Sequence, residues 1–114
     1  MGELSVGTVV LCRFPFSDLP SSKLRPCLII AEAEFGDIIV CQITSKTYTS
    51  KTAILLKKSN FEHGSLVTNS FIRPDKLATL DRRIVASSLG VLHQAKFEQC
   101  QGVLIRALGL RKKI

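Results

Sequence analysis

The sequence predicts a mainly β protein, a small barrel of short strands with one helix near the C-terminus. Short runs of β-branched and apolar residues recur along the chain with tight polar connections between them, as in small barrels. One segment, 94–108, instead places its apolar residues at helical spacing. A chain of 114 residues supports one hydrophobic core, so we expect residues 1–114 to form a single domain.

The first half of the chain predicts three strands. Gly7–Phe14 is β-branched and apolar, and the polar loop Ser17–Leu24 follows it. Pro26–Glu32 is almost continuously apolar, as expected for a strand covered on both faces. Glu34–Asp37 reads as a turn that leads into the third strand, Ile38–Thr44. We therefore expect the second and third strands to pair as a hairpin.

The second half predicts shorter elements. Three further short strands are expected, at Thr52–Leu56, Ser70–Ile72 and Lys76–Leu80. Arg73-Pro74-Asp75 connects the last two of them, and His63-Gly64 falls in a loop. Asp81–Ser87 fits either a helical turn or a further short strand, and the pattern alone does not choose between them.

The predicted helix is amphipathic. Its apolar side is formed by Phe97, Cys100, Val103, Leu104, Ala107 and Leu108, and its polar side by Lys96, Glu98, Gln99 and Arg106. Gly109 is suited to end the helix, because glycine readily adopts the left-handed conformation of a helix terminus. We expect the apolar side to pack on the strands.

The charge of the chain suggests the kind of partner. The formal net charge is +7 and the isoelectric point is near 9.6, which favours nucleic acid or an acidic protein, although a basic charge can also serve solubility alone. The longest apolar runs, Cys27–Ala31 and Ile38–Cys41, are too short to span a bilayer. We expect no membrane association and no signal peptide.

The cysteines do not form a metal motif. The sequence has four, Cys12, Cys27, Cys41 and Cys100, with no Cys-x-x-Cys pair. His63 and His93 do not complete a zinc-binding spacing. We expect buried free thiols in a reducing cytoplasm, and no bound metal.

Arg25 is the most informative candidate for chemistry. Pro26 fixes its own backbone and pushes Arg25 toward an extended conformation, at the junction of a polar loop and a buried strand. If the second and third strands form a hairpin, Arg25 lies beside Thr44. A guanidinium beside a hydroxyl in a basic groove suits phosphate chemistry. RNA carries its own nucleophile, the 2′-hydroxyl, so an enzyme needs mainly to position it, assist proton transfer and stabilise the developing charge.

Structural explanations remain for the same residues. Arg25 could form a surface pair with Asp18 or Asp37, and Thr44 could be an ordinary strand residue. A third charged group, Arg73-Pro74-Asp75-Lys76, could be a local ion pair that closes a turn.

Several segments resemble a known family in sequence order. They are Gly7–Leu11, Phe14–Asp18, Lys23–Ile30, Ile39–Ser45 and Ser70–Asp81. Together they resemble the PemK/MazF family of type II toxin–antitoxin toxins, most closely its PemK-like branch. The resemblance implies an SH3-like β-barrel with a C-terminal helix, acting as a homodimer. It also implies a metal-independent, cofactor-free endoribonuclease that cuts single-stranded mRNA at specific sequences and leaves a 2′,3′-cyclic phosphate.

The resemblance also assigns partners and residues. It implies a cognate acidic antitoxin that covers the active groove, and DNA binding through the complex with that antitoxin. By position, Arg25 and Thr44 match the family's catalytic residues. The residues expected to contact RNA are Lys23, Ser45, Lys46, Arg73, Asp75 and Lys76.

The loop before Arg25 departs from the family pattern. Many relatives have a glycine-rich loop there, whereas Asp18–Leu24 contains no glycine, so the recognised RNA sequence is open. Two other functions fit the same chain. One is a non-catalytic basic barrel that binds RNA or an acidic protein, and the other is a toxin that acts on a protein target such as DNA gyrase.

Overall fold

The structure is a computed structural model that describes residues 4–13, 23–46 and 50–110. These residues form seven strands and one α-helix: β1 Thr8–Arg13, β2 Leu24–Glu32, β3 Asp37–Thr44, β4 Ile54–Leu56, β5 Phe61–Gly64, β6 Ser70–Asp81, β7 Val85–Leu92 and α1 Gln94–Ala107. Single 3-10 turns lie at Glu34–Gly36, Lys58–Asn60 and Arg82–Ile84.

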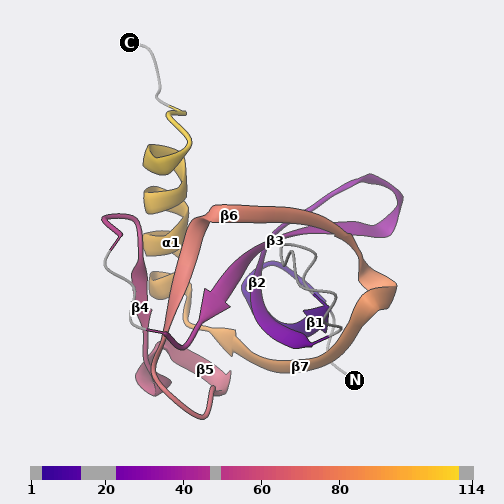
Figure 1. Ribbon diagram of the computed structural model, residues 1–114, viewed down its shortest axis with the longest axis horizontal. Coiled ribbons are helices and arrows are strands. Elements are labelled where there is room, and N and C mark those ends of the chain that lie inside the picture. The colour runs from indigo at the N-terminus through magenta and orange to yellow at the C-terminus, as the bar shows by residue number, and fades with distance from the viewer. Residues whose placement is uncertain (1–3, 14–22, 47–49, 111–114) are drawn as a thin grey trace.

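All seven strands belong to one antiparallel sheet in the order β4-β6-β3-β2-β1-β7-β5. The sheet curls into a half-barrel, with the long strands β6 and β7 curving around β1 and β2 and α1 standing to one side (Figure 1). The prediction of a mainly β, barrel-like fold with a C-terminal helix is confirmed.

The β2–β3 hairpin forms as predicted. Its register sets Cys27 opposite Gln42 and Leu28 opposite Cys41. Two residues beyond the Cys27–Gln42 pair, toward the open end of the hairpin, come Arg25 on β2 and Thr44 on β3. The local pairing rule therefore predicted the correct neighbours.

The prediction of two short strands around Arg73-Pro74-Asp75 is wrong, because β6 runs unbroken through this segment. Gln42 lies opposite Arg73 while the adjacent Cys41 lies opposite Leu77, so three residues of β6 bulge out of the ladder. Pro74 is buried within the bulge. A bulge tolerates proline because its residues have no partner that needs a backbone N–H.

Two other segments of the second half also differ from expectation. His63-Gly64 was expected in a loop, but it ends the edge strand β5, which pairs with β7. The open question at Asp81–Ser87 is answered by both alternatives in turn, a 3-10 turn at Arg82–Ile84 and then β7 from Val85.

Helix α1 ends and packs as its pattern predicts. Gly109 has a φ of 71°, and its N–H donates to Arg106 while that of Leu110 donates to Ile105. These two bonds are those of a Schellman terminus. Phe97 and Cys100 are buried, whereas Leu108, expected on the apolar side, is exposed. No helix within the described ranges is long and apolar enough to cross a membrane.

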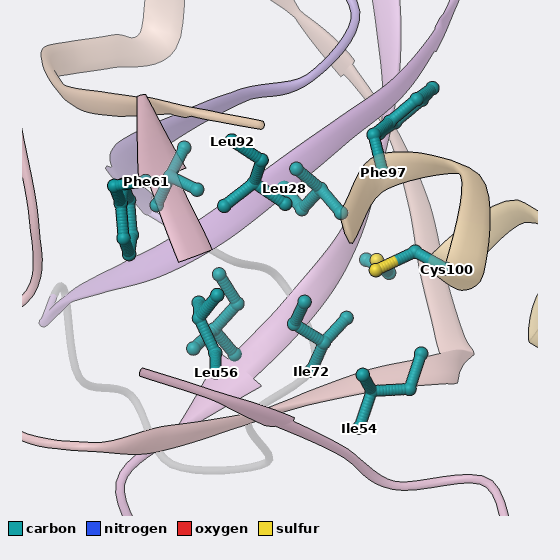
Figure 2. Close-up of a cluster of buried hydrophobic side chains, with 11 residues drawn as sticks. Leu28, Ile54, Leu56, Phe61, Ile72, Leu92, Phe97 and Cys100 are labelled. Carbon is teal, nitrogen blue, oxygen red and sulfur yellow. The ribbon is translucent and has the colours of Figure 1, made fainter. Parts of the chain in front are cut away.

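The buried side chains form two clusters, because successive strand residues point to opposite faces of the sheet. The first cluster lies partly under α1, as Figure 2 shows, and contains Val9, Leu28, Cys41, Ile43, Ile54, Leu56, Phe61, Ile72, Leu92, Phe97 and Cys100. The second cluster contains Val10, Cys12, Cys27, Ile29, Ile38, Val40 and Leu80. The prediction of buried, free cysteines is confirmed for all four.

Candidate functional site: a basic cleft at the open end of the β2–β3 hairpin

A cleft of about 480 Å³ lies where β2 begins and β3 ends. Five of the residues predicted for the site line it: Lys23, Arg25, Thr44, Ser45 and Lys46. A volume of several hundred cubic ångströms is typical of small-ligand sites. The structure therefore brings the hairpin residues of the predicted site together.

A further part of the cleft lining comes from a distant part of the chain. It is formed by Ser65, Leu66, Val67 and Thr68, in the connection between β5 and β6. Leu11 of β1 and Leu89 of β7 also line the cleft. Because strands separated in sequence build these surfaces, the cleft depends on the complete half-barrel.

Strand alternation divides the polar and apolar parts of this cleft. Pro26 and Ile43 point to the face of the first cluster, while Arg25 and Thr44 belong to the opposite face at the ends of the same strands. Arg25 and Thr44 are each partly exposed. The cleft therefore has apolar surface from one face of the sheet and a polar rim from the strand ends.

The structure separates Arg25 from one of its two expected surface partners. Arg25 is at the start of β2, whereas Asp37 is at the start of β3 and lies opposite Asp81. About 20 Å of strand length separates the two ends of the hairpin. Asp18, the other partner considered, lies outside the described residues.

Thr44 is held by a local turn at the end of β3. Its Oγ1 accepts a hydrogen bond of 3.2 Å from the backbone N–H of Lys46. This contact fixes the oxygen of the side chain while its O–H can still donate to a ligand. Ser45 and Lys46, in the same turn, are exposed.

The charged group on β6 lies beside the cleft and not in its lining. Arg73 is opposite Gln42, a lining residue, and its Nε lies 4.0 Å from Asp75 Oδ1. Asp75 is exposed and Lys76 is half-buried, both in the β6 bulge. The expected Arg73–Asp75 proximity is therefore confirmed, at a bulge within one strand and not at a turn between two.

Several lining residues were not singled out in the sequence. Gln42 precedes Thr44 by two residues on the same strand, so alternation alone could have indicated that the two share a face. Ser70 and the segment 65–68 carry no comparable signal, because they reach the cleft only through the pairing of β6 and the route of the connection before it.

The described lining residues include three cationic side chains, Lys23, Arg25 and Lys46, and no carboxylate. A concave surface lined by positive charges attracts anions and raises their local concentration. Within the described ranges, no group of three histidine, cysteine or acidic residues could hold a metal ion. The arrangement is able to bind a phosphate group between a guanidinium and a hydroxyl.

A small antiparallel half-barrel with a cation-lined cleft is thus the class of protein that the fold and the site define. The family of the "PemK-like, MazF-like toxin of type II toxin-antitoxin system" matches residues 5–108. The chain therefore belongs to this toxin family. No curated protein sequence matches it.

Solved structures share the fold at low sequence identity. An endoribonuclease in complex with its cognate antitoxin, from a mycobacterial species, has a TM-score of 0.73 at 20% identity, covering 95% of this chain and 97% of that one. The Mycobacterium tuberculosis toxin MazF-mt6 has a TM-score of 0.72 at 16% sequence identity, and the match covers 92% of this chain and 99% of that one. A MazE-MazF structure from Deinococcus radiodurans has a TM-score of 0.70 at 19% sequence identity, and the match covers 93% of this chain and 95% of that one.

Proposed function

We propose that this protein is a metal-independent, sequence-specific endoribonuclease toxin that cleaves single-stranded mRNA. The observation that carries the proposal is the cleft in which Arg25 and Thr44 lie together with Lys23 and Lys46. Membership of the toxin family supports it, and two structures of the same fold are named endoribonucleases. A concave site of this charge suits a polyanion that is bound along its phosphates.

In the proposed reaction, the 2′-hydroxyl of the substrate attacks the adjacent phosphorus. A phosphorane forms and the 5′-oxygen of the next nucleotide leaves, which gives a 2′,3′-cyclic phosphate and a 5′-hydroxyl. Arg25 donates two N–H groups to the non-bridging oxygens, where negative charge develops. The hydroxyl of Thr44 donates a further hydrogen bond to the same phosphate and fixes its position.

The other predicted residues hold the RNA on either side of the scissile phosphate. Lys23, Ser45 and Lys46 line the same cleft and supply contacts to phosphate and ribose. Arg73, Asp75 and Lys76 extend this surface along β6, next to Gln42, and contact flanking nucleotides. The partners in this proposal are single-stranded RNA, a second copy of the chain and a cognate acidic antitoxin, all in the cytoplasm.

The test of the proposed activity is RNA cleavage in EDTA. Purified protein is incubated with a defined RNA, and the new 5′ ends are mapped. We expect cuts at one repeated short motif, products with a 5′-hydroxyl, and no loss of rate with EDTA. Salt-sensitive RNA binding without cleavage products would instead favour the non-catalytic barrel.

Replacing Arg25 tests its assignment. Removing one donor to a developing oxyanion costs about 10²–10³-fold in rate, so we expect Arg25→Ala to lose at least this much cleavage. Arg25→Lys should recover only part of it, because an ammonium lacks the planar fork. Arg106→Ala is the matched control, because Arg106 is exposed on α1 away from the cleft. Equal cleavage by Arg25→Ala and Arg106→Ala would disprove the catalytic role.

A further inference from the structure

Cys12 and Cys27 form a pair of buried thiols directly behind the cleft. Their Sγ atoms lie 3.3 Å apart, and both residues are fully buried in the second cluster. Cys27 follows Arg25 and Pro26, which line the cleft. The Sγ of Cys27 also lies 3.6 Å from the carbonyl oxygen of Arg25. The two thiols therefore lie close to each other and to the backbone of the proposed catalytic arginine.

The strand register makes this pair a diagonal one. Cys12 of β1 is directly opposite Arg25 of β2, and Cys27 is opposite Val10. Diagonal neighbours have Cα atoms about 7–8 Å apart, which is at or beyond the upper end of what a disulfide spans. Closing a bond between the two sulfurs therefore requires β1 and β2 to shift where Arg25 is attached.

The two thiols also differ in reactivity. The hydrogen bond between the sulfurs lowers the pKa of Cys12, although burial opposes this, and the same hydrogen bond together with burial raises the pKa of Cys27. Burial raises the pKa of Cys41 well above its ordinary value and that of Cys100 to about 11. Oxidants attack the thiolate, and Cys12 is the thiol of the four whose pKa is lowered. All four thiols are buried, so a peroxide reaches Cys12 only when the strands open locally.

We propose that Cys12 and Cys27 are a redox modification site, which a peroxide oxidises to an intramolecular disulfide that displaces Arg25. The sulfur of Cys12 attacks one peroxide oxygen, the O–O bond breaks, and a sulfenic acid and water form. The thiol of Cys27 then attacks that sulfur, forms the S–S bond and releases the second water. Two thiols are oxidised by two electrons, and hydrogen peroxide is reduced to two waters. A dithiol such as dithiothreitol reduces the disulfide by thiol–disulfide exchange and reverses the change.

The consequence for activity rests on the proposed function, whereas formation of the disulfide does not. Displacing a group that holds the reacting phosphate by about 1 Å can cost about 10²-fold in rate. We therefore expect the oxidised protein to cleave RNA about 10²-fold more slowly than the reduced protein.

The experiment compares wild type with Cys12→Ala, Cys27→Ala and Cys41→Ala. Each protein is treated with hydrogen peroxide, digested without reduction and analysed by mass spectrometry for linked peptides. Cys41→Ala is the matched control, because Cys41 is a buried thiol of the first cluster. We expect a Cys12–Cys27 link in wild type and in Cys41→Ala, and none in the other two.

A second readout follows Arg25 without RNA. Amide hydrogen exchange of the peptide that contains Arg25 should rise on oxidation of wild type and return with dithiothreitol. RNA cleavage is measured in the same samples, beginning with the reduced protein. If the reduced protein does not cleave RNA, the proposed function fails while the peptide link and the exchange still test the redox site. Absence of the link, or a link with unchanged exchange, would overturn the redox proposal.

Discussion

Gly90 is a residue that cannot take a Cβ atom without its neighbours moving. It lies opposite Gly64 where β7 pairs with β5. A Cβ added at Gly90 would lie 2.8 Å from Cδ2 of Phe61 and would meet the carbonyl oxygen of His63. The close approach of two backbones therefore explains why glycine occupies this position.

We expect Gly90→Ala to destabilise the protein by about 1–3 kcal/mol, because the extra methyl group overpacks a closed site. Gly102→Ala is the control, for which we expect a change in stability of the opposite sign. Gly102 lies inside α1, and the nearest atom to an added Cβ there is Nη1 of Arg106, at 3.7 Å. Alanine in a helix interior should stabilise by about 0.5–1 kcal/mol. Urea unfolding of both variants measures the two effects, and a loss of stability in both would contradict the argument.

The turn between β6 and β7 is held by two charge pairs, Arg82 with Glu32 and the exposed pair Arg83 with Asp81. The carboxylate of Asp81 accepts hydrogen bonds from the backbone N–H of Arg83, at 2.8 Å, and from its guanidinium. These hydrogen bonds lower the pKa of Asp81 to about 2. The pair therefore favours the short 3-10 turn that directs the chain from one long strand into the next.

This pair predicts a specific dependence of stability on acid. The pKa of Asp81 is lower in the folded protein than in the unfolded chain, so its contribution is present above about pH 4 and is lost as the pH falls toward 2. The Asp81→Asn variant should lack the part of the acid-induced loss of stability that protonation of Asp81 causes. Thermal unfolding of both proteins between pH 5 and 2 measures it. If the unfolding temperatures of the two proteins fell in parallel with pH, the role given to Asp81 would be wrong. Added salt should reduce the difference between the two proteins, because the Asp81–Arg83 pair is exposed.

The elements differ in how well local sequence predicts them. The hairpin of β2 and β3 has two long apolar runs and the helix α1 has helical spacing of its apolar residues, and both form at nearly the expected residues. Strand β5 is four residues long on a sheet edge with Glu62 and His63 exposed, so it has almost no apolar signal. Strand β6 was divided in error at Pro74, because a three-residue bulge cannot be recognised from local preference alone.

At the scale of the whole molecule, the charge of +7 is less informative than where the cations lie. Three of them, Lys23, Arg25 and Lys46, line the cleft. If each neutralises one phosphate, log K for single-stranded RNA should fall with log salt at a slope of about −2. Titrations with RNA methylated at its 2′-hydroxyls, which cannot be cleaved, measure this slope.

A pair of lysine variants tests the same point. Lys46→Ala should reduce the slope by about 0.7, because one released counterion is lost. Lys58→Ala should leave the slope unchanged, because this exposed lysine lies outside the cleft lining. Equal changes in the two variants would show that overall charge, and not the cleft, determines RNA affinity.

The candidate site was predictable only as far as its contacts are local. Arg25 and Thr44 could be placed together because a hairpin joins neighbouring segments of the chain. The wall formed by residues 65–68 and Leu89 depends on strands that pair across long sequence separations. No local pattern encodes such contacts, since they arise from closing the whole sheet.

The position of β1 has a consequence for how the protein is made. This strand lies between β2, which follows it directly, and β7, which begins only at Val85. While the ribosome is still translating the middle of the message, β1 has only one of its two partners, and the cleft lacks Leu89. A growing chain therefore has no complete cleft until β7 has been synthesised and has paired with β1.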